Sequence, residues 1–179
     1  MDDNVVSLFN KRLAGHDALK TALTLLRTDG TEENYSWNDY RNKATYVTEW
    51  LKSHDVKRGD FVAIIPLNLP ESFFAMMGII LAGAVPVPIN VQLLKEPGLV
   101  DLKRILDDCK PKLVLTNEFL YAFLPKIELC IIGGIIGNTQ IHPPHYLYCP
   151  VPSQNDLLIL PYTSGTSQLK GAMLTHKNV

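Results

Sequence analysis

The sequence predicts an α/β protein in which helices flank a mainly parallel β-sheet. Between residues 61 and 116, apolar runs of strand length alternate with segments of helical periodicity. Such β-α-β crossovers build parallel sheets that are covered by helices. Of the 179 residues, 46% are hydrophobic and 20% are charged, which is typical of a globular domain. No linker or repeat divides the chain, so we expect residues 1–179 to lie in one domain.

The N-terminal region predicts a short helix, a β-hairpin and a longer helix. Apolar residues between Val5 and Leu13 favour the short helix. Segments 22–26 and 33–37 flank the dipeptide Asp29-Gly30, which is typical of a tight hairpin turn. Ser36 can then serve as the N-cap of a helix. The apolar positions of this helix recur at spacings of three and four: Trp37, Tyr40, Ala44, Val47 and Leu51.

The central region predicts a buried strand and a buried helix, followed by another short strand. Segment 61–67 is a continuous apolar run of strand length. Pro70 suits the first position of the helix over 71–81, which is apolar on nearly every face. The next strand, 85–89, contains prolines 86 and 88, which favour an edge or irregular strand because proline has no N–H to donate.

The last third predicts one amphipathic helix and three more strands. The helix over 99–109 has an apolar face opposite a charged one, whose i, i+3 and i, i+4 pairs indicate a solvated surface. Strands are expected over 112–116, 157–163 and 172–176. The proline-rich segment 142–152 is expected to be an irregular connection.

Composition indicates that partners are recognised locally rather than through a global charge. Seventeen basic and eighteen acidic residues give a net charge of −1, which favours no nucleic acid partner and no anionic membrane. We expect no membrane span, because the longest apolar segments fall short of about 20 residues. The acidic start lacks a secretory signal, so a cytoplasmic location is expected. Cys109, Cys130 and Cys149 are expected to be reduced thiols, with no metal site.

A hydroxyl-rich loop after the strand 157–163 is the candidate binding site. It contains Thr163, Ser164, Gly165, Thr166, Ser167, Lys170 and Gly171. Glycine lets backbone N–H groups turn inward, hydroxyls donate further hydrogen bonds and lysine adds a positive charge, so the loop could hold phosphate. An ordinary surface turn is the alternative. The location after a strand supports the phosphate hypothesis, because ligands of open α/β sheets bind at strand carboxyl ends.

The loop resembles the phosphate-binding signature of the adenylate-forming superfamily, Tyr-Thr-Ser-Gly-Thr-Thr-Gly-x-Pro-Lys-Gly. The segment from Tyr162 to Gly171 is one residue shorter than that signature. Further segments resemble landmarks of the family's N-terminal region in the same order: 36–40, 59–64, 66–68 with Glu71, and 82–90. The sequence from about Ser36 onward is therefore similar to the N-terminal portion of this superfamily, within its acyl-CoA synthetase branch.

The resemblance implies a fold, a reaction and its co-substrates. The fold would be the N-terminal subdomain of acyl-CoA synthetases, truncated. Such enzymes activate a carboxylic acid, here expected to be a fatty or other aliphatic acid, with ATP and Mg²⁺ as an acyl-adenylate. Coenzyme A is the co-substrate of the complete enzyme. By resemblance, segment 163–171 would embrace the β- and γ-phosphates, with Lys170 as the cationic contact.

The family's later motifs and its C-terminal lid domain lie beyond the position that corresponds to Val179. We therefore expect this chain to have no catalytic residues and to be inactive alone, because residues that act as a unit fail together. Alternatives are a non-catalytic nucleotide-binding or interaction module, which the shortened loop favours, and one half of a split ligase with a complementing C-terminal chain. Uncovered apolar faces also predict marginal solubility or self-association.

Several other residues are open to more than one interpretation. His142 and His145 flank two prolines, which favours an exposed loop over a metal site. His176 could orient a carboxylate substrate or simply pack. Asn68 and Glu71 are explained by the start of a helix. The apolar run Phe73, Phe74, Met76 and Met77 favours core packing over an acyl pocket.

Overall fold

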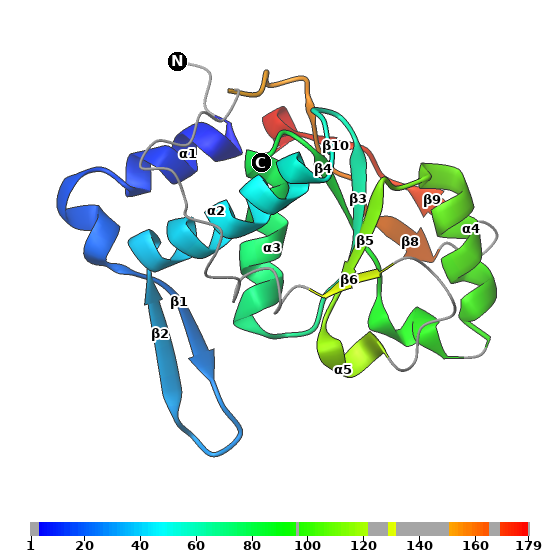
Figure 1. Ribbon diagram of the computed structural model, residues 1–179, viewed down its shortest axis with the longest axis horizontal. Coiled ribbons are helices and arrows are strands. Elements are labelled where there is room, and N and C mark those ends of the chain that lie inside the picture. The colour runs from blue at the N-terminus through cyan, green and yellow to red at the C-terminus, as the bar shows by residue number, and fades with distance from the viewer. Residues whose placement is uncertain (1–3, 96, 122–128, 132–150, 165–168, 179) are drawn as a thin grey trace.

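The chain begins with a helix and a β-hairpin. A computed structural model describes residues 4–95, 97–121, 129–131, 151–164 and 169–178 (Figure 1). The first elements are α1 (Val5–Arg12), the 3-10 helix η1 (Gly15–Leu19), β1 (Thr21–Leu26) and β2 (Glu32–Ser36). Strands β1 and β2 pair antiparallel, as the sequence predicts.

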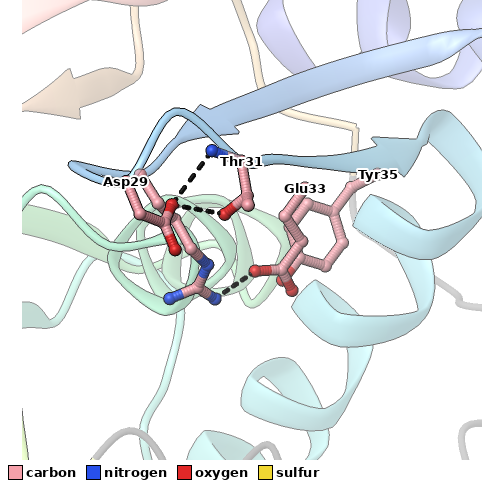
Figure 2. Close-up of polar contacts among 5 residues, drawn as sticks. Asp29, Thr31, Glu33 and Tyr35 are labelled. Atoms are coloured by element: carbon pink, nitrogen blue, oxygen red, sulfur yellow. Dashed lines mark hydrogen bonds and ion pairs between the residues drawn. The ribbon is translucent and has the colours of Figure 1, made fainter.

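The tip of this hairpin is held by one carboxylate. Figure 2 shows Asp29 beside Thr31: its Oδ1 accepts hydrogen bonds from the Thr31 backbone N–H at 2.9 Å and from the Thr31 hydroxyl at 2.7 Å. Gly30 has a φ of 83°, a conformation that residues with a side chain rarely adopt. On the two sides of the turn, Arg27 forms an ion pair with Glu33. The predicted tight turn at Asp29-Gly30 is thus confirmed.

Helix α2 (Trp37–Ser53) begins directly after the hairpin. The Ser36 hydroxyl accepts a hydrogen bond from the Asp39 backbone N–H at 3.1 Å, while the Asp39 carboxylate accepts one from the Ser36 N–H at 2.9 Å. This reciprocal pair forms a capping box, which satisfies backbone donors that no helical turn can reach. The predicted N-cap at Ser36 is confirmed.

The centre of the protein is a four-stranded parallel sheet in the order β4-β3-β5-β6. Its strands are β3 (Phe61–Ile65), β4 (Val85–Pro88), β5 (Leu113–Thr116) and β6 (Leu129–Ile131). The helical segments between them are α3 (Pro70–Leu81), the 3-10 helix η2 (Val91–Leu94), α4 (Leu99–Cys109) and α5 (Glu118–Tyr121). The predicted α/β class is therefore confirmed, whereas β6 has no counterpart among the predicted strands.

Helices cover both faces of the sheet (Figure 1). Val62 and Ile64 of β3 belong to one core cluster with residues of α2 and α3. The alternate residues Ala63 and Ile65 belong to a second cluster with residues of α4. Since successive side chains of a strand point to opposite faces, β3 is apolar on both sides and lies between two helical layers.

The prolines of β4 place it at the edge of the parallel sheet. Val85 donates its N–H to the Asp60 carbonyl at 2.8 Å, and Ile89 donates to the Ile64 carbonyl at 2.8 Å. Prolines 86 and 88 lie at the alternate positions, whose backbone nitrogens point away from β3 and have no hydrogen to donate. That outer edge can only accept hydrogen bonds, and the Pro86 carbonyl accepts one from the Leu160 N–H at 3.0 Å.

The last described elements form two small antiparallel pairs beside the parallel sheet. They are β7 (Leu157–Ile159) with β10 (Leu174–Thr175), β8 (Tyr162–Ser164) with β9 (Leu169–Gly171), and the 3-10 helix η3 (His176–Asn178). The prediction of one strand over 157–163 was wrong. The chain breaks at Leu160 and Pro161, because Pro161 has no N–H and the outer edge of β4 offers no donors.

Candidate functional site

The candidate phosphate loop is carried by the hairpin of β8 and β9. Thr163 lies directly opposite Lys170 in this antiparallel pair, and both side chains are exposed. Directly opposed residues share one face of a strand pair, so a hydroxyl and an ammonium group lie side by side on the surface. Ser164 ends β8. The predicted residues Gly165, Thr166 and Ser167 lie outside the described residues.

Strands β8 and β9 form a separate two-stranded sheet, and neither of them belongs to the parallel sheet. The sequence prediction placed the loop at the end of a parallel strand, and this detail was wrong. The Ala172 N–H donates to the Pro161 carbonyl at 2.8 Å and so closes the base of the hairpin. The position of the loop therefore depends on contacts of β8 and β9 with their surroundings.

Tyr162 fixes the base of the hairpin to helix α4. Its hydroxyl donates to the Asp108 carboxylate at 2.5 Å. Burial of the ring and this hydrogen bond raise the pKa of the Tyr162 hydroxyl above its ordinary value. Burial also raises the pKa of the neighbouring Cys109 thiol to about 11, and Cys109 is a free, buried cysteine. This thiol is therefore protonated at neutral pH and packs as an apolar group.

Gly171 has a packing role opposite Tyr162. A Cβ added at Gly171 would lie 3.1 Å from Leu160 Cδ1 and 3.3 Å from two ring atoms of Tyr162. Because those distances are tighter than ordinary van der Waals contacts, the absence of a side chain lets the Tyr162 ring lie against β9. The glycine that the sequence analysis placed in the loop thus supports the anchor residue.

His176 begins η3 and lies near β7, away from the candidate phosphate loop. The residue is 4% exposed, and its Nδ1 has no hydrogen-bond partner among the described residues. A small cavity of about 150 Å³ adjoins it, lined also by Arg58 and Asp156, which form an ion pair. Burial lowers the pKa of His176, and the nearby Asp156 partly opposes that effect. These contacts favour the packing interpretation of His176 over direct contact with a substrate.

The structure corrects one further prediction about apolar residues. Phe74 is buried in the core, as expected. Phe73, however, is 42% exposed, and with Met77 it lines a cavity of about 760 Å³ near the N-terminal helix. The assignment of all four residues to the core was therefore wrong. The first turn of α3, which contains Phe73, is not covered on one side.

The remaining candidates agree with the structural interpretation or fall outside the described residues. Asn68 is exposed before α3, and Glu71 lies in the first turn of that helix. His142, His145 and Cys149 lie outside the described residues. Within the described ranges, no group of three His, Cys, Asp or Glu side chains could hold a metal ion. No helix in the same ranges is long and apolar enough to cross a bilayer.

The described part of the chain combines a parallel sheet, two helical layers and a hairpin that carries a hydroxyl and a lysine. Residues 9–179 match the family of AMP-binding enzymes, and the chain belongs to this family. It is 28% identical over 180 residues to a crotonobetaine/carnitine–CoA ligase of Citrobacter koseri. That match covers 89% of this chain and 34% of the ligase, so the chain spans about one third of the length of the curated relatives it matches.

Solved structures show the same fold. A fatty acyl-adenylate ligase from L. pneumophila, in complex with acyl adenylate and pyrophosphate, superposes with a TM-score of 0.82 at 24% identity. The superposition covers 97% of this chain and 30% of that ligase. The anthranilate CoA ligase AuaEII, in complex with anthranoyl-AMP, gives a TM-score of 0.72 at 26% identity, covering 98% of this chain and 34% of the ligase.

Proposed function

We propose that this chain is the N-terminal portion of an ATP-dependent acyl-CoA synthetase. The complete enzyme would activate a carboxylic acid, in particular a fatty or other aliphatic acid, as an acyl-adenylate and transfer it to coenzyme A in the cytoplasm. Family membership and the likeness to CoA ligases support this proposal. In it, residues 1–179 form part of the AMP-binding domain.

The pairing of Thr163 with Lys170 is the observation that carries the proposal. A hydroxyl donor and a cation on one exposed face of a hairpin suit a phosphate oxygen, which prefers charge-assisted hydrogen bonds. Thr163, Ser164 and Lys170 would hold the β- and γ-phosphates together with the loop residues 165–167, and Mg²⁺ would accompany the nucleotide. ATP, when bound, supplies the phosphorus that the carboxylate attacks, with pyrophosphate as the leaving group.

The role of this chain's own residues in that reaction is to position the nucleotide. Lys170 would neutralise phosphate charge, and the tie between Tyr162 and Asp108 would hold the hairpin in one place. No described residue is assigned to proton transfer or to the attack itself. We therefore propose that the isolated chain does not form acyl-adenylate and that further residues must complete the site, in the same polypeptide or in a complementing chain.

Nucleotide binding is tested by thermal shift. ATP with Mg²⁺ should raise the melting temperature of the wild-type chain, because a ligand of the native state stabilises it by mass action. Lys170→Ala should lose most of this shift. Lys177→Ala removes another exposed lysine, in η3, and should keep it. An unchanged shift in Lys170→Ala would contradict the assignment of the loop.

Catalytic competence is tested separately by pyrophosphate exchange. The isolated chain, incubated with ATP, labelled pyrophosphate and a panel of fatty acids, should give exchange at background level. Robust exchange would show that the isolated chain is active and would overturn that part of the proposal.

The shortened loop favours a second candidate function, a non-catalytic module that no longer forms acyl-adenylate. The absence of any ATP shift in the wild-type chain would favour this second function.

A further inference from the structure

A cavity of about 760 Å³ lies near the N-terminal helix. Two of the elements that line it, α1 and β1, lie at the opposite side of the molecule from the hairpin of β8 and β9 (Figure 1). It is bounded by α1, β1, the start of α2 and one side of α3. Ligand pockets in proteins commonly have volumes of about 300–1,000 Å³. The wall is mostly apolar and includes Leu8, Phe9, Leu23, Trp37, Phe73 and Met77. The size and lining of this cavity suit an organic ligand.

Ring contacts hold the wall in shape. The Phe9 ring meets the Trp37 ring edge-on, with centroids 5.9 Å apart, and meets the Tyr40 ring at 5.7 Å. The Tyr40 hydroxyl donates to the Phe73 carbonyl at 2.9 Å and so joins α2 to α3 at the cavity. A preformed wall loses little conformational freedom when a ligand binds, which favours binding.

The charges at the cavity favour an anionic group on the ligand. Arg12 ends α1 beside the cavity, is exposed, and makes no ion pair within the ranges that the structure describes. Asp17 also lines the cavity, and Lys20 Nζ lies 2.5 Å from Asp17 Oδ1. Lys20 and, to a smaller extent, Arg12 lower the pKa of the Asp17 carboxyl. Two basic residues, Lys11 and Arg12, line the cavity together with the acidic Asp17, so the net charge of its lining is positive.

We propose that this cavity binds a single-chain aliphatic carboxylic acid, with the chain against Trp37 and Phe73 and the carboxylate at Arg12. This site would be separate from the phosphate loop and would not depend on the proposed ligase function. A free acid fits better than a membrane surface. Stable attraction to anionic lipid needs a cluster of several basic residues around an exposed apolar face, whereas this apolar wall is concave.

Tryptophan fluorescence tests the proposal, because Trp37 lines the cavity and the only other tryptophan, Trp50, stacks on His54 outside it. In Trp50→Phe, Trp37 is the single reporter. Titration with dodecanoate below its micelle threshold should give a saturable change in emission. Affinity should rise about two- to fourfold for each added methylene between decanoate and tetradecanoate. Calorimetry on the wild-type chain provides the same affinities without a variant.

Two variants, each with a control, distinguish the contribution of the apolar wall to binding from the contribution of the positive charge. Leu8→Asn, on the cavity wall, should weaken dodecanoate and dodecanol alike by about fivefold, whereas Val100→Asn, an exposed apolar residue of α4, should not. Arg12→Gln should weaken dodecanoate five- to tenfold and leave dodecanol unchanged, with recovery in Arg12→Lys. Lys103→Gln, on the exposed side of α4, is the matched charge control.

Three results would overturn the proposal. The first is a flat titration in both fluorescence and calorimetry. The second is equal dodecanoate affinity in the wild type and Leu8→Asn, which would place the ligand elsewhere. The third is tighter binding to anionic lipid vesicles than to monomeric dodecanoate, which would indicate a membrane surface in place of a free acid.

Discussion

His176 is a buried histidine beside a small cavity that Arg58 and Asp156 also line. Its ring is nearly inaccessible, and its Nδ1 lacks a partner among the described residues. The neutral ring is the form that such an environment tolerates, because a buried cation loses its hydration. Burial accordingly lowers the pKa of His176 from its ordinary value of 6.5, although the Asp156 carboxylate draws it upward to a smaller extent.

We predict that this histidine makes the protein less stable as the pH falls. In the unfolded chain His176 takes up a proton near its ordinary pKa, whereas the folded chain takes it up only at lower pH. Below pH 6.5 the unfolded state therefore binds more protons, and the free energy of unfolding falls by at most about 1.4 kcal/mol per pH unit. Melting temperatures from pH 7.5 to 5.5 should decrease more steeply for the wild type than for His176→Gln. Parallel slopes would contradict this origin.

Tyr162 is the residue on which the position of the phosphate hairpin depends. Tyr162→Phe keeps the ring and removes the hydroxyl with its hydrogen bond to Asp108, so it should lower the free energy of unfolding by about 1 kcal/mol. It should also reduce the thermal shift caused by ATP, since the hairpin loses its tie to α4. Urea unfolding and ATP titration measure the two effects. Tyr46→Phe is the control, because the Tyr46 hydroxyl makes no hydrogen bond within the described ranges. If both variants behave alike, the anchor assignment fails.

At the scale of elements, α2 and α3 pack unusually close at Gly78. A Cβ added there would lie 2.6 Å from Val47 Cβ and 2.7 Å from the Ala44 carbonyl oxygen. The Thr48 hydroxyl donates to the Gly78 carbonyl at 2.9 Å across the same contact. The close approach therefore depends on a residue without a side chain, and it brings both helices against one face of the sheet.

We expect Gly78→Ala to destabilise the protein, although alanine is the better helix former. The added methyl group meets the backbone and the Val47 Cβ, neither of which can rotate away, and overpacking of this kind costs about 1–3 kcal/mol. The gain in helix propensity offsets less than about 1 kcal/mol. Chemical denaturation measures the net loss. Lys103→Ala, at an exposed helical position, should change stability by less than about 0.5 kcal/mol. A Gly78→Ala protein as stable as the wild type would refute the close packing.

The elements that the sequence predicts well are those with a strong local signal. Strand β3 follows from an unbroken apolar run, α2 from spacings of three and four after Ser36, and the edge position of β4 from its prolines. Strand β6 has only three residues, too few for periodicity to distinguish it. The break at Leu160 and Pro161 depends on hydrogen-bond donors that β4 cannot offer, which is a property of a distant segment.

In the candidate site, too, the sequence predicts features with a local signal and misses contacts between distant residues. The hydroxyls, the glycines and Lys170 are recognisable from the sequence because they lie within nine residues. The tie between Tyr162 and Asp108 joins residues 54 positions apart, and nothing in the local sequence pairs them. The apolar cavity was missed because contiguous apolar residues on a helix favour core packing, and the exposure of Phe73 depends on how α1 and β1 lie against α3.

At the scale of the whole molecule, large apolar side chains remain on the surface near the last strands. Met173 is 73% exposed and Leu174 is 39% exposed, and Leu174 belongs to β10, which pairs only with β7 among the described strands. An apolar group next to an unpaired strand edge is a typical site of association between chains. The described part of the protein thus supports the sequence prediction of self-association without testing it.

We therefore expect the isolated chain to associate through the surface around β10. Sedimentation should show a weight-average mass above the 20.0 kDa of one chain, rising with protein concentration. Met173→Lys should shift the mass toward one chain, because a charge on the contact surface must lose hydration when the surface is covered. Leu19→Lys changes an equally exposed apolar residue, 74% exposed in η1, and should leave association unchanged. A wild-type chain that stays at 20.0 kDa across concentrations would contradict the prediction, and an equal response of both variants would place the contact away from β10.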